Sequence, residues 1–163
     1  MKEFGCRTGL VLCIFCGSIG LSGILAEAAT SAATRSLAAN AQKTVSLRLG
    51  TKGDEMAFNK TTLSAPAGAS IKLTFKNDSK TLQHNFVLTK TGAAEEVANA
   101  GLTAGVEKSY VVESPNVIAH TKLLNFGQAE TLTFVAPSEP GDYPYLCTFP
   151  GHATMMKGIF RVK

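Results

Sequence analysis

The sequence has no tryptophan, only three histidines and few charged residues, which make up 17% of its 163 residues. Its formal net charge is +4, and the lysines are scattered without a basic run of the kind that binds nucleic acid. We therefore expect no nucleic-acid partner. Three histidines are also too few for an enzyme that needs several metal sites. No Ser/His/Asp set, phosphate-binding loop or carboxylate pair stands out, so the sequence predicts no enzymatic activity.

The first 28 residues have the composition of an export signal. Lys2 and Arg7 precede an uncharged run over residues 9–26, which leads to the small-x-small sequence Ala26-Glu27-Ala28. This order is typical of a cleaved signal peptide, so we predict cleavage after Ala28 and a periplasmic protein. The uncharged run also approaches the ~20 residues of a membrane-spanning helix, so retention as an anchor is the alternative. Residues 29–43, rich in Ala, Thr and Ser, are predicted to be a flexible linker.

Cleavage changes the number of cysteines. Cys6, Cys13 and Cys16 lie in the leader, and the mature chain keeps Cys147 alone. A single thiol in an oxidising compartment is usually oxidised, paired between chains, or protected because it has a function. Cys147 is therefore a candidate functional residue, with a buried structural thiol as the alternative.

Residues 44–163 have the pattern of a single β-sandwich domain. Residues 45–49 and 71–75 alternate between apolar and polar side chains, which indicates half-buried strands. Further candidate strands are residues 85–89, 109–112, 131–136, 143–147 and 158–162, separated by turn sequences. Short strands with regular turns predict an all-β fold with two sheets. A helix is expected only over residues 93–100, as a short crossover between the sheets.

The densest chemistry lies between Cys147 and Gly158, where a thiol, an imidazole and a thioether follow one another. Cys147 ends a predicted strand, and Pro150-Gly151 turns the chain so that His152 can face the thiol. A methionine follows before the last strand. A second imidazole would complete two His and one Cys with a weak axial Met, which is the ligand set of blue copper.

Two histidines remain for that second position. His84 follows a strand of the opposite sheet, and the amide of its neighbour Asn85 could tie the two ligand-bearing loops together. His120 lies in the extended run of residues 117–122, which is typical of a sheet surface. The sequence therefore favours His84 and predicts a solvated His120.

Several segments resemble one known family. Residues 147–158 are similar to the copper-binding loop of azurin nearly residue for residue, and residues 54–59, 83–85 and 117–123 also resemble azurin. Gln83 and the short approach over residues 77–81 are more similar to auracyanin. The resemblance to the azurin/auracyanin group spans about residues 45–163, and it implies a Greek-key β-sandwich with the cupredoxin fold.

The same resemblance implies roles for individual residues. Copper is expected in the plane of His84, Cys147 and His152, with Met156 as the axial ligand. The four-residue step from His152 is the azurin spacing, which favours Met156 over Met155. Azurins usually have Gly where this chain has Gln83, so a fifth contact from the Gln83 carbonyl is an open question. Asn85 and the backbone N–H of Phe149 are expected near the sulfur, and partners are expected to dock on Leu82, Phe149, Pro150 and Met155.

The predicted function is that of a type 1 blue-copper protein that carries single electrons. Its partners are expected to be redox proteins such as c-type cytochromes or membrane electron-transfer complexes, and the chain is expected to be monomeric. A copper or zinc carrier without redox traffic is the alternative, since zinc also binds Cys and His. A blue colour that bleaches on reduction distinguishes the two.

Overall fold

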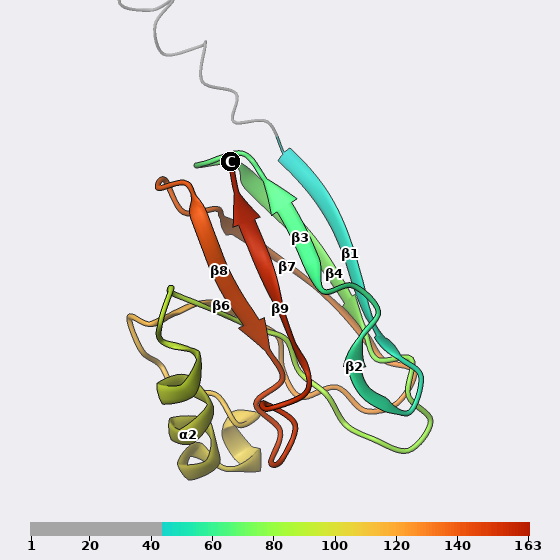
Figure 1. Cartoon of the computed structure of the whole chain (residues 1–163). Coiled ribbons are helices and arrows are strands. Elements are labelled where there is room, and N and C mark those ends of the chain that lie inside the picture. The colour runs from blue at the N-terminus through green and yellow to red at the C-terminus, as the bar shows by residue number, and fades with distance from the viewer. Residues whose placement is uncertain (1–43) are drawn as a thin grey trace, which may run out of the picture. The chain divides into compact units, whose positions relative to one another are not determined.

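The computed structural model describes residues 44–163. The predicted signal peptide (1–28) and linker (29–43) lie outside the described residues. Two sheets face each other, as predicted for an all-β sandwich (Figure 1). One sheet has the order β2 (Glu55–Phe58), β1 (Thr44–Lys52), β4 (Ser70–Lys76) and β7 (Ala129–Val135). The other has the order β3 (Thr62–Ala65), β9 (Lys157–Val162), β8 (Gly141–Leu146), β5 (Val87–Thr89) and β6 (Val117–His120).

The alternating pattern of the sequence places the core between the sheets. Ile71, Leu73 and Phe75 of β4 are fully buried, whereas Lys72 and Lys76 of the same strand are exposed. Aromatic rings fill the centre, with ring centroids 5.2 Å apart for Phe58 and Tyr145 and 5.5 Å apart for Phe86 and Tyr145. Such close packing restricts how far the connections at the ends of the strands can move.

One predicted strand is absent, and two short strands were missed. The run at residues 109–112 is not a strand, because Ser109 and Tyr110 adopt left-handed φ values of 55° and 57°. The Tyr110 N–H instead donates to the Gly105 carbonyl oxygen, which closes a turn after the short 3-10 helix η1 (Val106–Lys108). The four-residue strands β2 and β3 were not predicted.

The helix α2 (Ala94–Ala104) forms where the sequence indicates one, but it does not cross between the sheets. It joins β5 to β6, which are neighbours in the five-stranded sheet. The reason is its apolar face: Val97 is buried in a cluster with Val87 of β5 and Val111. The helix therefore covers one sheet. Among residues 44–163, no helix is long and apolar enough to span a membrane.

The connections at one end of the sandwich carry the residues of interest. The β8–β9 loop lies at the end opposite the C-terminus, on the side where α2 packs (Figure 1). The β4–β5 connection changes from the four-stranded to the five-stranded sheet, and the β6–β7 connection returns. The β4–β5 connection contains His84, and an isolated bridge pairs His84 with Leu124 of the β6–β7 connection.

Candidate metal centre

His84, Cys147 and His152 converge at one buried point. The Cys147 Sγ atom lies 3.8 Å from His84 Nδ1 and 3.6 Å from His152 Nδ1. All three side chains are buried, with exposed fractions of 0%, 0% and 4%. In the described part of the chain, this is the one group of His, Cys, Asp or Glu side chains close enough to hold a metal ion. The structure therefore brings together the three residues predicted to lie in the copper plane.

Burial changes the acid–base chemistry of the cluster. It raises the pKa of the Cys147 thiol to about 11, although the backbone N–H groups of Asn85 and Phe149 act in the opposite direction. Burial also lowers the pKa of His84 to about 4, helped by the nearby His152, and it lowers the pKa of His152. Both imidazoles are therefore neutral at neutral pH and ready to bind a metal, whereas the thiol must release its proton.

The β8–β9 loop folds back on itself through its own backbone. The His152 N–H donates to the Phe149 carbonyl oxygen at 3.0 Å, and the Met156 N–H donates to the His152 carbonyl oxygen at 2.8 Å. The Cys147 N–H then donates to the Met156 carbonyl oxygen at 3.0 Å, which closes the loop. Gly151 makes the reversal with a φ of 82°, a value that favours glycine.

The two neighbouring methionines have opposite environments. Met156 is fully buried in the same core cluster as Cys147, whereas the side chain of Met155 is 63% exposed. A soft thioether is thus buried with the thiol, and a second thioether faces solvent. One thiolate, two imidazoles and a buried thioether suit copper, for which soft sulfur and imidazole ligands are both favourable.

Asn85 ties the two ligand-bearing loops together. Its side-chain carbonyl accepts the Thr148 N–H at 2.8 Å, and its Nδ2 donates to Thr148 Oγ1 and to the Ser109 carbonyl oxygen, each at 2.8 Å. The bridging role expected of Asn85 is therefore present. It is the backbone N–H of Asn85, not its side-chain amide, that faces the sulfur. Sequence reasoning missed Thr148 and Ser109, whose roles depend on the fold.

A second buried amide, Asn77, lies at the start of the β4–β5 connection. Its Nδ2 donates to the Leu82 carbonyl oxygen at 2.8 Å and to the Leu124 carbonyl oxygen at 3.0 Å. Its Oδ1 accepts the Ser79 N–H at 3.0 Å. The position of Asn77 directly after the buried strand β4 was the available signal for this role. The side chain holds the start of the segment that carries His84.

The remaining predicted residues lie around the cluster. Gln83 is half-buried, and its side-chain amide donates to Asn125 Oδ1. The Phe149 ring centroid lies 4.7 Å from that of His152. The residues expected to form a docking surface are half-buried (Leu82 and Phe149) or exposed (Pro150 and Met155). His120 is exposed on β6 and lies outside the cluster, as expected for a solvated histidine.

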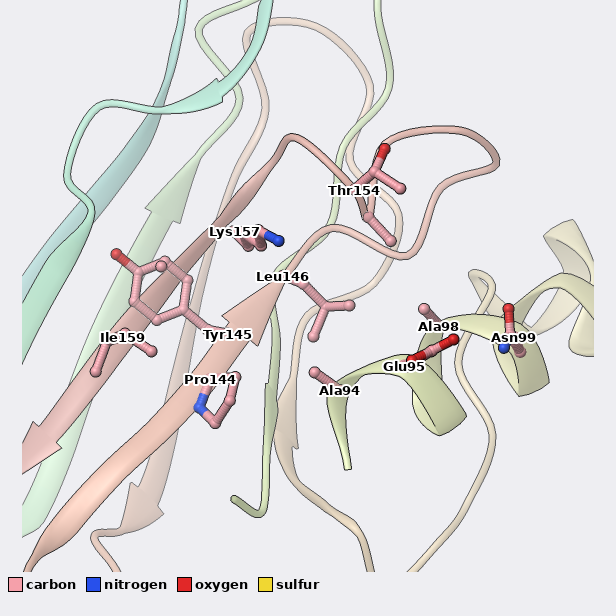
Figure 2. A pocket seen from close by; sticks show the side chains of 12 residues that line it. Ala94, Glu95, Ala98, Asn99, Pro144, Tyr145, Leu146, Thr154, Lys157 and Ile159 are labelled. Atoms are coloured by element: carbon pink, nitrogen blue, oxygen red, sulfur yellow. The ribbon is translucent and has the colours of Figure 1, made fainter. Parts of the chain in front are cut away.

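A groove of about 690 Å³ lies beside the cluster, between α2 and the β8–β9 hairpin. Figure 2 shows Ala94 and Ala98 of α2 facing Leu146 of β8, with Lys157 nearby. None of the residues proposed as ligands lines this groove. The metal-binding chemistry is therefore located in the buried cluster and not in the open groove.

Comparisons with known proteins agree with this geometry. A family model described as copper binding proteins, plastocyanin/azurin family, matches residues 45–163. Auracyanin-A of Chloroflexus aurantiacus is 44% identical over 117 residues, which cover 70% of this chain and 72% of auracyanin-A. Azurin of Bordetella pertussis is 35% identical over 117 residues, 67% of this chain and 78% of that azurin. The solved structure of auracyanin A, a "blue" copper protein, has a TM-score of 0.70 at 42% identity and covers 74% of this chain and 100% of auracyanin A.

Replacing Asn85 should weaken the link between the two loops. We expect Asn85→Ala to lower the free energy of unfolding of the copper-free protein by about 2–4 kcal/mol. The reason is that each buried polar group left without a partner costs about 1–3 kcal/mol. Denaturant unfolding measures the change. Asn99→Ala, at an exposed position on α2, is the control and should change the value by less than about 0.5 kcal/mol. Equal effects of the two substitutions would contradict the bridging role.

Proposed function

Because this chain belongs to the plastocyanin/azurin family of copper-binding proteins, we propose that it shuttles single electrons between redox proteins by cycling one copper ion between Cu(I) and Cu(II). The observation that supports this most directly is the buried Cys147 thiol, with the Nδ1 atoms of two imidazoles within 4 Å of its sulfur. Electron transfer is the general activity of blue-copper proteins of this family. The proposal assigns no catalytic reaction to the chain.

We propose that His84, Cys147 and His152 would hold the copper ion, with the Met156 thioether as a fourth, weaker ligand. Copper supplies the one-electron couple when bound, and the protein supplies a soft thiolate that binds both oxidation states. Close packing of the sandwich holds these side chains in nearly the same positions in both states. The backbone N–H groups of Asn85 and Phe149 donate toward the sulfur and tune it. A fifth contact from the Gln83 carbonyl remains part of this proposal.

We propose that electrons leave the protein through His152. Its ring packs on Phe149, and the side chains of Leu82, Pro150 and Met155 are at least partly exposed. A small and largely uncharged surface of this kind suits weak, transient complexes, as redox encounters require. We propose c-type cytochromes or membrane electron-transfer complexes as partners of a monomeric protein.

We propose the periplasm as the location of the protein. That assignment depends on cleavage of residues 1–28 as a signal peptide and on a linker over residues 29–43 ahead of a cupredoxin domain at 44–163. Retention of the leader would instead anchor the same domain to a membrane. The N-terminal sequence of the mature protein distinguishes the two.

Loss of the thiol should remove the blue colour. We expect Cys147→Ser to abolish the strong thiolate-to-copper absorption, because a hydroxyl cannot supply the soft ligand, while the circular dichroism of a β-sandwich persists. His120→Gln is the matched histidine control and should keep the colour. Absorption and paramagnetic-resonance spectra of the two copper-loaded variants show whether each retains the thiolate–copper absorption. A blue Cys147→Ser protein would refute the assignment, and a wild-type colour that does not bleach on reduction would favour a metal carrier.

The axial assignment can be tested with the two neighbouring methionines. Met156→Leu should keep copper and colour but raise the reduction potential, because loss of a weak axial donor disfavours Cu(II) more than Cu(I). Met155→Leu is the matched control and should leave the potential unchanged. Voltammetry of the copper-loaded variants measures the difference. If Met155→Leu raised the reduction potential instead, Met155 and not Met156 would be the thioether ligand.

The docking surface can be tested separately from the copper site. We expect Met155→Lys to slow electron self-exchange between oxidised and reduced protein, because it places like charges face to face in the encounter complex. The optical spectrum should remain that of the wild type. Nuclear magnetic resonance line broadening in mixtures of the two oxidation states measures the rate, and Met155→Leu serves as the uncharged control. An unchanged self-exchange rate for the lysine variant would mean that electrons leave the protein through a different surface.

A further inference from the structure

Among the described residues, only one of the two ring nitrogens of His84 has a polar partner. Its Nδ1 faces the Cys147 sulfur, and its buried Nε2 has no hydrogen-bond partner among the described residues. Metal-binding histidines commonly donate their second ring N–H to an oxygen, which fixes the ring orientation. Without such a bond, the position of this imidazole depends on the backbone that carries it.

On one side of His84, that backbone is anchored by Leu124. The His84 N–H donates to the Leu124 carbonyl oxygen at 3.2 Å, and the Leu124 N–H donates to the His84 carbonyl oxygen at 2.9 Å. On the other side, residues 79–82 form no strand, and side chains satisfy several of their backbone groups. Asn77 is one of the residues that do this. Another comes from a distant turn, between β1 and β2.

That residue is Asp54. Its Oδ1 accepts hydrogen bonds from Ser79 Oγ at 2.7 Å, from the Lys80 N–H at 2.7 Å and from Thr81 Oγ1 at 3.2 Å. A hydroxyl has one proton and two lone pairs. Because the Ser79 hydroxyl gives its proton to Asp54, its lone pairs can accept the Leu82 N–H at 2.8 Å and the Thr81 N–H at 3.1 Å. The carboxylate thus fixes the chain to within two residues of His84.

The charge of Asp54 strengthens these hydrogen bonds. Its hydrogen bonds, that of Ser79 first, hold the pKa of the Asp54 carboxyl below its usual value, so the group is ionised at neutral pH. A hydrogen bond to an ionised acceptor is shorter and stronger than one to a neutral acceptor. The ionised carboxylate therefore holds residues 79–81 more firmly than a neutral oxygen would.

We propose that Asp54 is a positioning residue of the copper centre, which holds His84 in place by clamping residues 79–82. This inference rests on the proposed function, because it assumes that His84 binds copper. It assigns a role to the β1–β2 turn, which lies outside the ligand-bearing loops.

Two substitutions test the clamp. Asp54→Ala removes the acceptor oxygen, so we expect Cu(II) affinity to fall by about tenfold or more, as for other residues that orient a metal ligand. In the copper-free protein, the Lys80 and Leu82 amides should exchange hydrogen faster. Asp54→Asn keeps an acceptor oxygen, so amide protection and copper affinity should stay closer to those of the wild type.

The matched control is Glu55→Ala, which removes a neighbouring exposed carboxylate that pairs only with Lys52. This variant should retain wild-type copper affinity, and its Lys80 and Leu82 amides should exchange at the wild-type rate. If Asp54→Ala behaved like this control, the inference would be overturned. If Asp54→Ala failed to fold, Ser79→Ala would decide: faster exchange at Leu82 with weaker copper binding supports the clamp, and unchanged values overturn it.

The design separates this inference from the proposed function. A wild-type protein that binds no copper would refute the proposed function. The amide-exchange comparison in the copper-free protein would still show whether Asp54 clamps the segment. A wild-type protein that binds copper and turns blue, together with an Asp54→Ala variant of equal affinity and equal amide exchange, would remove the inference alone.

Discussion

Exclusion of water from one thiol and two imidazoles is the constraint around which the rest of the structure is arranged. A polar group without water favours its neutral form, which is why the pKa of His84 falls to about 4 and that of Cys147 rises to about 11. A metal binds the neutral form of an imidazole, so the low pKa values of the two histidines do not oppose metal binding. The thiol must lose its proton before it can bind a metal. The fold therefore buries a polar cluster, which costs free energy unless its groups are hydrogen-bonded or bind a metal.

The cluster lies among connections rather than strands, so side chains must replace the hydrogen bonds that a sheet would provide. Three residues perform this task at separate points. Asn85 links the two ligand-bearing loops, Asn77 holds the carbonyl groups of Leu82 and Leu124, and Asp54 binds the Ser79–Thr81 turn. Each is an Asn or Asp side chain, which can reach backbone groups that no strand pairs. The rigidity that electron transfer requires is thus provided by a few short polar side chains on a packed sandwich.

Residues that act locally could be predicted from the sequence, and residues that act across the fold could not. Cys147, His152 and Met156 lie on one loop, so their spacing alone indicated a common site, and the fully buried positions of β4 followed from simple alternation. The Tyr110-Val111-Val112 run favours a strand by composition, but the buried contacts of Val111 under α2 override that preference. Asp54 gave no local signal, because its partners are 25 to 27 residues away in the chain.

The place of β9 in its sheet has a consequence for biosynthesis. This last strand lies between β3 and β8, parallel to β3, so residues 62–65 pair with residues 159–162. Strands this far apart in the sequence pair slowly. The chain loses conformational entropy when it closes the long loop between them, before the contacts of the paired strands can offset that loss. The five-stranded sheet is incomplete until β9 has been made and has paired with its neighbours. Until then the core around the Cys147 thiol lacks Phe160 and Val162, so the protection of this thiol from oxidation is complete only when β9 is in place.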